Sequence, residues 1–158
     1  MRTVDERVCK APASVAFRVA ADVEGWPDVL PHYRWVRFHK PLEEGTGIVE
    51  MAAWREFPGF RYPTWWLSEM DVDERTQRVL YRHIKGITKG MDVVWKVEDL
   101  GDGTSHLSII HEWEGPRWPL IGGVAAEWII GPYFINHIAG RTLLGISTAA
   151  EAAAGRAA

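Results

Sequence analysis

Cysteine, clustered charge and long apolar runs are all scarce in this chain, and each scarcity excludes a class of protein. Cys9 is the only cysteine, so an intrachain disulfide is impossible and a reducing compartment is favoured. The N-terminus lacks the apolar segment of a signal peptide, and the most apolar stretch, 128–140, is too short and too polar to span a bilayer. The sequence therefore predicts a cytoplasmic protein without stable membrane insertion.

The sequence motifs of cofactor and metal sites are also missing. There is no glycine-rich dinucleotide or phosphate loop, no Cys-x-x-Cys pair and no serine nucleophile elbow. His111-Glu112 lacks the second histidine of a zinc-protease helix, and the other histidines show no ligand spacing. The net charge is -3 with scattered lysines and arginines, which argues against nucleic acid as a partner. We therefore expect no metal, no cofactor and no nucleic-acid partner.

Tryptophan, by contrast, is abundant, with nine residues in a chain of 158. They are Trp26, Trp35, Trp54, Trp65, Trp66, Trp95, Trp113, Trp118 and Trp128. Core packing is one explanation, but a tryptophan is difficult to bury fully and its N–H group needs a partner. A surplus beyond the needs of the core indicates either a wide cavity walled by flat rings or an exposed contact patch.

Hydrophobic periodicity predicts a strand, two short helices and then six more strands in a chain long enough for one domain, 1–158. The first strand is Thr3–Lys10, and the short helices begin at Pro12 and near Asp28. The later strands are Tyr33–His39, Gly47–Phe57, Tyr62–Asp71, Arg78–Lys85, Met91–Leu100 and Ser105–Trp113. Short turns rich in Gly, Pro and Asp connect them, so an antiparallel meander is expected.

The remainder of the chain is predicted to be helical. An apolar stripe with a spacing of three or four begins at Ile121, and Pro132 should kink or split it. From Pro132 to Ala154 the helix would be about 34 Å long, which makes it the only element able to cover the sheet. Residues 155–158 form a tail that we expect to fray. The predicted fold is α+β, a curved antiparallel seven-stranded sheet around a long C-terminal helix.

Local phrases along the chain resemble the polyketide cyclase/dehydrase family of the START-like superfamily, which has the helix-grip fold. The phrases lie at residues 8–17, 21–27, 82–83, 90–95, 103–104 and 138–143. They span essentially the whole chain. The resemblance implies a ligand held between the concave face of the sheet and the long helix. Relatives of this kind include aromatase/cyclases, coenzyme Q-binding proteins and proteins that associate with ribosomes.

Strand alternation selects the residues that should face such a cavity. An apolar face on the third predicted strand, from Val49 through Met51, ends in Arg55. The set expected to bind the ligand is Trp26, Tyr33, Met51, Arg55, Trp66, Ser68, Met70, Trp95, His111, Trp113 and Trp128. Of these, Trp26 and Tyr33 match the Trp and Tyr that reach the pocket in the aromatase/cyclases. Met70 falls where those enzymes carry an arginine, and Arg55, Arg82 or Arg141 could take its place.

Three polar residues are candidates for catalysis. Arg55 and Tyr33 could hydrogen-bond a carbonyl or enolate oxygen, while His111 or a water moves a proton. The competing interpretation places Arg55 in an ion pair with Glu69 or Glu112 and makes His111 a satisfied core histidine, because an unpaired buried charge is costly.

Two functions therefore remain open. One is an enzyme that cyclises or dehydrates a polyketide-like substrate, which requires several polar groups converging in the cavity. The other is a non-catalytic carrier or sensor for a lipid, an isoprenoid quinone or an aromatic metabolite, which requires few. In both cases the expected partner is a bulky hydrophobic small molecule. A homodimer is compatible with either function.

Overall fold

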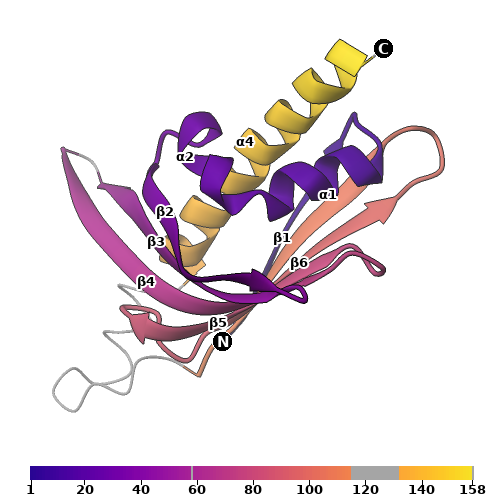
Figure 1. Cartoon of the computed structure of the whole chain (residues 1–158). Helices are drawn as coiled ribbons and strands as arrows, with labels where there is room; N and C mark the ends of the chain where they lie inside the picture. Colours follow the sequence, from indigo (N-terminus) through magenta and orange to yellow (C-terminus); the bar gives the residue numbers. More distant parts are fainter. Residues whose placement is uncertain (58, 115–131, 158) are drawn as a thin grey trace, which may run out of the picture.

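The computed structural model describes residues 1–57, 59–114 and 132–157 (Figure 1). The strands are β1 (Arg2–Cys9), β2 (Tyr33–Glu43), β3 (Thr46–Phe57), β4 (Phe60–Asp73), β5 (Arg78–Gly86), β6 (Asp92–Asp99) and β7 (Ser105–Glu112). The helical segments are α1 (Ala13–Ala21), the short 3-10 turn η1 (Val23–Gly25), α2 (Trp26–Val29) and α4 (Pro132–Ala157).

The strands form one seven-stranded sheet in the order β1-β7-β6-β5-β4-β3-β2. Every neighbouring pair is antiparallel. The N-terminal strand β1 pairs with β7 and forms one edge of the sheet. The sheet curves around α4, while α1 and α2 lie on the same side of it as α4 (Figure 1). This arrangement confirms the predicted α+β helix-grip fold.

Most boundaries differ from the sequence prediction by one or two residues, and three elements show the most informative differences. Strand β2 runs on to Glu43 through Pro41, which a sheet tolerates because β2 is an edge strand. Helix α2 begins at Trp26 rather than near Asp28, with Pro27 in its first turn. Helix α4 ends at Ala157, past the predicted end at Ala154. The stripe predicted over 121–131, and with it any break before Pro132, lies outside the described residues.

Helix α4 covers the concave face through one stripe of side chains. Its buried residues recur every three or four positions and are Ile135, Ala139, Thr142, Leu143, Ile146, Ser147 and Ala150. That spacing places them on one face of the helix, as the amphipathic pattern requires. The helix packs chiefly against β1 and α1, so it lies toward one edge of the sheet. Among the described residues, no helix is long and apolar enough to cross a membrane.

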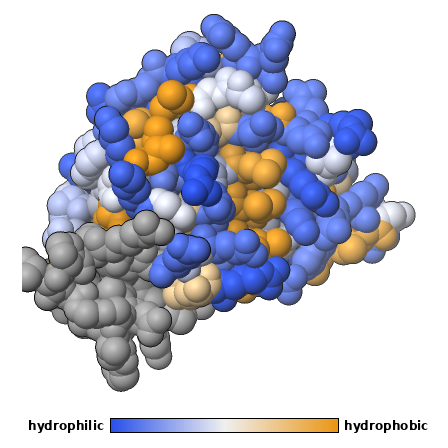
Figure 2. Space-filling view, turned by 90° about the horizontal axis from the view of Figure 1, so that it is seen from below, coloured by the Kyte–Doolittle hydropathy of each residue, from blue (hydrophilic) through white to orange (hydrophobic). Residues whose placement is uncertain are grey.

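The outer face of the sheet carries hydrophobic side chains among hydrophilic ones (Figure 2). Strand register aligns four of them across neighbouring strands, namely Val4, Ile110, Val94 and Leu80. Val4 and Leu80 are exposed. Isolated apolar residues on a protein surface are ordinary, and ion pairs such as Arg82–Asp92 flank this row.

Two glycines of α4 give a matched test of how closely the helix is packed. A Cβ at Gly145 would overlap the end of the Leu30 side chain, which is fully buried, whereas one at Gly140 would meet open space. We expect Gly140→Ala to stabilise the protein by up to about 1 kcal/mol through helix propensity. Gly145→Ala should destabilise it by about 1–3 kcal/mol through overpacking. Urea denaturation measures both, and equal shifts would contradict the packing described here.

Candidate functional site

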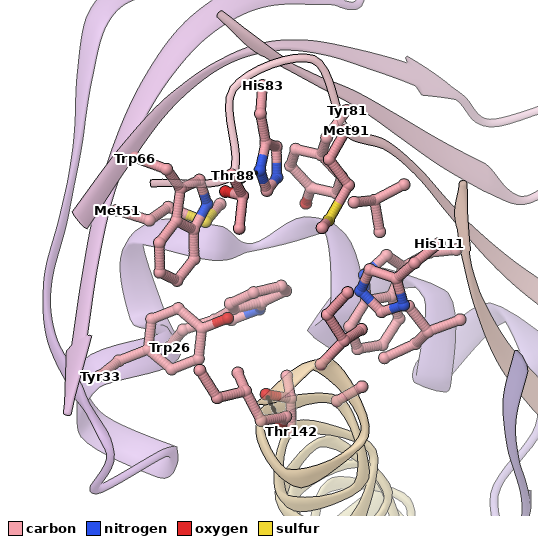
Figure 3. A pocket seen from close by; sticks show the side chains of 16 residues that line it. Trp26, Tyr33, Met51, Trp66, Tyr81, His83, Thr88, Met91, His111 and Thr142 are labelled. Carbon is pink, nitrogen blue, oxygen red and sulfur yellow. Dashed lines mark hydrogen bonds between the residues drawn. The ribbon is translucent and has the colours of Figure 1, made fainter. Parts of the chain in front are cut away.

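A cavity lies between the concave face of the sheet and the first turns of α4 (Figure 3). It is lined by Trp26, Tyr33, Met51, Trp66, Tyr81, His83, Thr88, Met91, Val93, Trp95, Ile109, His111, Ile135, Ile138, Ala139 and Thr142. The free volume is about 80 Å³. Small-molecule sites usually span roughly 300–1,000 Å³, so aromatic side chains fill most of the space between sheet and helix.

Aromatic rings packed against one another at steep or tilted angles build one side of the cavity. The Trp26 ring lies 5.2 Å from Tyr33 and 5.5 Å from Trp95, measured between centroids. The Tyr33 ring is in turn 6.1 Å from Trp66. These rings come from α2, β2, β4 and β6, so elements distant in sequence meet in one aromatic wall. The Trp26 N–H donates to the carbonyl of Val19, which leaves its ring face for the cavity.

His83 lies at one end of this wall. Its ring stacks on Trp66 at 5.8 Å, and its Nδ1 atom is 2.6 Å from the Thr88 hydroxyl. Thr88 reaches that position because the chain turns back sharply after β5, with Gly86 at a φ of 98°. Burial, together with the nearby His111, lowers the pKa of His83 to about 3, so the ring is neutral at pH 7.

His111 enters the cavity from β7. Its Nδ1 atom is 3.4 Å from the Thr3 hydroxyl of the neighbouring strand β1. Burial lowers the pKa of His111 to about 4, so this ring too is neutral near pH 7. Within the described residues the Nε2 atoms of His83 and His111 make no hydrogen bond. Each therefore retains a nitrogen that could serve a ligand.

Two tyrosine hydroxyls complete the polar part of the cavity. Tyr81 is 5% exposed, and its hydroxyl is buried without a hydrogen-bond partner among the described residues. Burial, reinforced by Tyr33, raises the pKa of Tyr81, and burial likewise raises the pKa of Tyr33. Both phenols are consequently neutral donors. Beside them, the Thr142 hydroxyl donates to the carbonyl of Ile138 and lies 2.9 Å from Nε2 of His32.

The cavity brings together six of the residues selected from the sequence. They are Trp26, Tyr33, Met51, Trp66, Trp95 and His111. Strand alternation oriented Met51, Trp66, Trp95 and His111, whereas Trp26 and Tyr33 were selected through the family resemblance. Tyr33 and His111, two of the three proposed catalytic residues, therefore line the same cavity (Figure 3).

Other selected residues are buried but do not line the cavity. Arg55 is 6% exposed and lies opposite Tyr62, nearer than Met51 to the end of β3. Ser68 and Met70 continue the inward face of β4 beyond Trp66, and Met70 lies opposite Tyr81. Trp113 donates its N–H to the carbonyl of Lys89, 3.1 Å away. Trp128 lies outside the described residues.

Four polar residues of the cavity were not selected from the sequence, namely Tyr81, His83, Thr88 and Thr142. Strand β5 has apolar residues on both faces, because Leu80 is 40% exposed while Tyr81 is 5% exposed. Alternation therefore did not reveal which face was inner. In the structure His83 lies opposite Ser68, but the register between two strands is a tertiary property that the sequence alone did not show.

The described residues contain no group of three or more His, Cys, Asp or Glu side chains able to hold a metal ion. The chemistry within reach of the cavity is that of neutral imidazoles and hydroxyls. Such groups can accept or donate single protons and hydrogen-bond an oxygen atom.

Comparison with known families gives one match. Residues 9–127 fit the model described as polyketide cyclase / dehydrase and lipid transport. A search of curated protein sequences finds no match to the chain.

Solved structures share the fold at low sequence identity. An aromatase/cyclase from Streptomyces sp. R1128 superposes with a TM-score of 0.82 at 19% identity, covering 96% of this chain and 93% of its own. A protein from Thermus thermophilus superposes with a TM-score of 0.80 at 19% identity, covering 97% of this chain and 99% of its own. A START superfamily protein from Mycobacterium smegmatis gives a TM-score of 0.68 at 14% identity, covering 99% of both chains.

The buried neutral histidines predict a specific loss of stability in acid. The pKa of His83 is about 3 in the folded protein and near its usual 6.5 in the unfolded chain, so unfolding takes up a proton between these values. The protonation of His83 therefore leaves the free energy of unfolding unchanged above about pH 6.5 and lowers it as the pH drops toward 3. At about pH 5 the loss from His83 alone should be about 2 kcal/mol.

Urea denaturation of the wild type and of His83→Gln, at about pH 7.5 and about pH 5, tests this prediction. The variant should lose less stability than the wild type between the two conditions, by about 2 kcal/mol. His39→Gln is the control, because His39 is exposed and paired with Glu50. A wild-type protein equally stable at both pH values would refute the neutral buried state.

Proposed function

The chain belongs to the polyketide cyclase/dehydrase and lipid transport family, and from this premise we propose that it binds an uncharged, oxygen-bearing ring compound in the cavity and catalyses its aldol cyclisation or dehydration. The observation that carries the proposal is the convergence of Tyr81, His83 and His111 within an aromatic wall. A carrier needs only a few orienting groups, whereas proton transfer needs a donor and an acceptor close together.

The roles follow from the protonation states. The neutral Nε2 of His111 can accept the α-proton of a ketone, directly or through a water. The hydroxyl of Tyr81 can donate to the carbonyl oxygen that becomes negative when this proton leaves, and Tyr33 is placed to do the same. In the cavity, Tyr81 supplies the donor that the sequence analysis sought in Arg55.

The proposed reaction balances without an external oxidant or reductant. The α-carbon loses its proton to His111, attacks a second carbonyl carbon and forms the new C–C bond. The resulting alkoxide takes this proton back from His111, which gives a hydroxyl group and restores the neutral imidazole. Loss of a further α-proton together with this hydroxyl then releases one water and leaves a conjugated enone. Each step needs one acceptor and one donor, which neutral His111 and Tyr81 provide.

A carrier function is the second candidate, and the composition of the cavity wall favours it. Apart from the few polar groups, the wall consists of aromatic and aliphatic side chains, and among the described residues no cation lines it. A wall of this kind holds a hydrophobic molecule by burial alone. The low pKa of both histidines also makes them weak bases, which suits binding better than fast proton transfer.

Either function requires the cavity to expand. A free volume of about 80 Å³ is smaller than that of most small-molecule sites, which span roughly 300–1,000 Å³. Met51 and Met91 line it and have flexible, unbranched side chains that repack at low cost. We propose that a larger ligand displaces these methionines and uses the space they occupy.

Binding can be tested with two probes of the same shape, α-tetralone and the hydrocarbon tetralin. Only the ketone can accept a hydrogen bond from Tyr81. We expect Tyr81→Phe to weaken α-tetralone binding by roughly threefold to tenfold, the scale of one neutral hydrogen bond, and to leave tetralin unaffected. Quenching of tryptophan emission measures both affinities. Equal weakening of the two probes would contradict a donor role for Tyr81, and absence of any binding would contradict the cavity proposal.

Turnover separates the enzyme from the carrier. A linear diketone whose ends can close into a six-membered ring provides a direct assay, because the enone product absorbs in the ultraviolet. We expect the wild type to accelerate ring closure and His111→Gln to lower the rate by roughly a hundredfold with little change in affinity. Arg55→Met is the control outside the cavity wall. Binding without acceleration by the wild type would favour the carrier.

A further inference from the structure

Three of the tryptophans do not belong to the cavity but lie on the outer face of β2, β3 and β4. Trp35 and Trp65 both lie opposite Ala52, which alternates with the inward-facing Met51 and Ala53. Trp54 is two residues further along β3, and therefore on the same face as Ala52. The exposed contact patch that the tryptophan content suggested is thus present beside the cavity.

Arginines stack on these rings. The Arg34 guanidinium lies 4.4 Å from the centroid of Trp35 and 4.6 Å from that of Trp54. Arg37 lies 5.1 Å from Trp35, and Arg61 lies 5.1 Å from Trp54. We call these five residues the arginine–tryptophan patch. Stacking on a ring leaves the N–H groups of a guanidinium able to bind an anion.

The positive charge of the patch is not neutralised by the described residues. Arg34, Arg37 and Arg61 are exposed, and none of them is in an ion pair there. The two nearest carboxylates in register have other partners. Glu50, opposite Arg37, is 2.7 Å from His39, and Glu56, opposite Arg61, is 2.6 Å from Arg141. The three guanidinium groups are therefore available to bind an external anion.

Exposed aromatic side chains continue from the patch along β4 to the β3–β4 hairpin, which projects beyond the rest of the sheet (Figure 1). Phe60 is 60% exposed, Tyr62 is 51% exposed and Trp65 is 47% exposed. Tyr62 lies opposite the inward-facing Arg55, whereas Trp65 faces outward. The projecting hairpin thus carries aromatic side chains on both of its faces.

We propose that the arginine–tryptophan patch and the β3–β4 hairpin dock onto the surface of an anionic lipid bilayer. Aromatic residues favour the headgroup level, and arginines there bind lipid phosphates and carboxylates. A bilayer interface can surround a projecting hairpin from both sides, whereas a flat protein partner contacts one face.

Sedimentation with lipid vesicles tests the proposal. The wild type should bind vesicles of phosphatidylcholine mixed with phosphatidylserine, should not bind phosphatidylcholine alone, and should be released by salt. Each arginine near an anionic surface contributes roughly fivefold to the partition coefficient. The triple substitution Arg34→Gln, Arg37→Gln and Arg61→Gln should therefore weaken binding by roughly a hundredfold.

A second triple variant keeps the comparison free of net-charge effects. Arg75→Gln, Arg78→Gln and Arg156→Gln remove the same charge from exposed sites outside the patch, and this protein should retain most of the binding. Circular dichroism confirms that both variants fold. Failure of the wild type to bind the mixed vesicles overturns the proposal, as does equal binding by the two triple variants.

The aromatic part is tested independently of the arginines. Bound to vesicles that contain brominated lipid, the wild type should show strong quenching of Trp65, seen as the difference from Trp65→Phe. Bromine quenches only rings at the bilayer, so the buried tryptophans contribute little to that difference. No difference between the two proteins would show that another face binds the membrane and would overturn the assignment to this hairpin.

Discussion

One helix has to cover the concave face of a seven-stranded sheet, and the cavity exists because α4 covers only part of it. The helix packs chiefly on β1 and α1, near one edge of the sheet. Over the middle strands the gap is closed instead by rings from the other elements, led by Trp26, Tyr33 and Trp66. A flat ring fills a gap less completely than a second helix would, because interiors pack densely only where shapes interlock. The residual space and its aromatic lining therefore have the same origin.

Much of this arrangement could be predicted from the sequence because strand alternation and helical periodicity are local. The inward direction of Met51, Trp66 and His111 follows from the parity of their strands. Where a residue lies along its strand relative to the cavity depends on the whole sheet and is therefore not a local property. Arg55 is buried, as its parity predicted, but it lies beyond the cavity wall because the sheet curves away toward the β3–β4 hairpin. His83 shares the buried parity of Val79 and Tyr81, but the sequence did not show which face of β5 was the inner one.

The polar groups of the cavity reduce stability, and a ligand or a bound water could offset this cost by supplying hydrogen bonds. The Tyr81 hydroxyl is buried and has no hydrogen-bond partner in the part of the chain that the structure describes, and a buried hydroxyl in that state costs about 1–3 kcal/mol. Holding His83 and His111 neutral costs further stability whenever the solution is acid enough to protonate the unfolded chain. Apolar side chains at the same positions would avoid both costs. Tyr81, His83 and His111 nevertheless line one aromatic cavity. Their presence despite this cost is the physical reason to assign the cavity a ligand with hydrogen-bonding atoms.

Six of the tryptophans lie on the two opposite sides of the sheet, three on each side, and they have different surroundings there. On the concave side Trp26 packs against Trp95 and Tyr33, and Tyr33 packs against Trp66. All of these rings line the cavity, so their large apolar area stabilises the fold. On the outer side the rings are stacked beneath arginines, which keeps the guanidinium groups extended and ready to bind an anion. Adjacent residues of β4 serve opposite faces, since Trp66 lines the cavity and Trp65 is exposed. Strand β4 thereby connects the surface proposed to meet a lipid bilayer directly to the wall of the cavity proposed to hold a hydrophobic ligand.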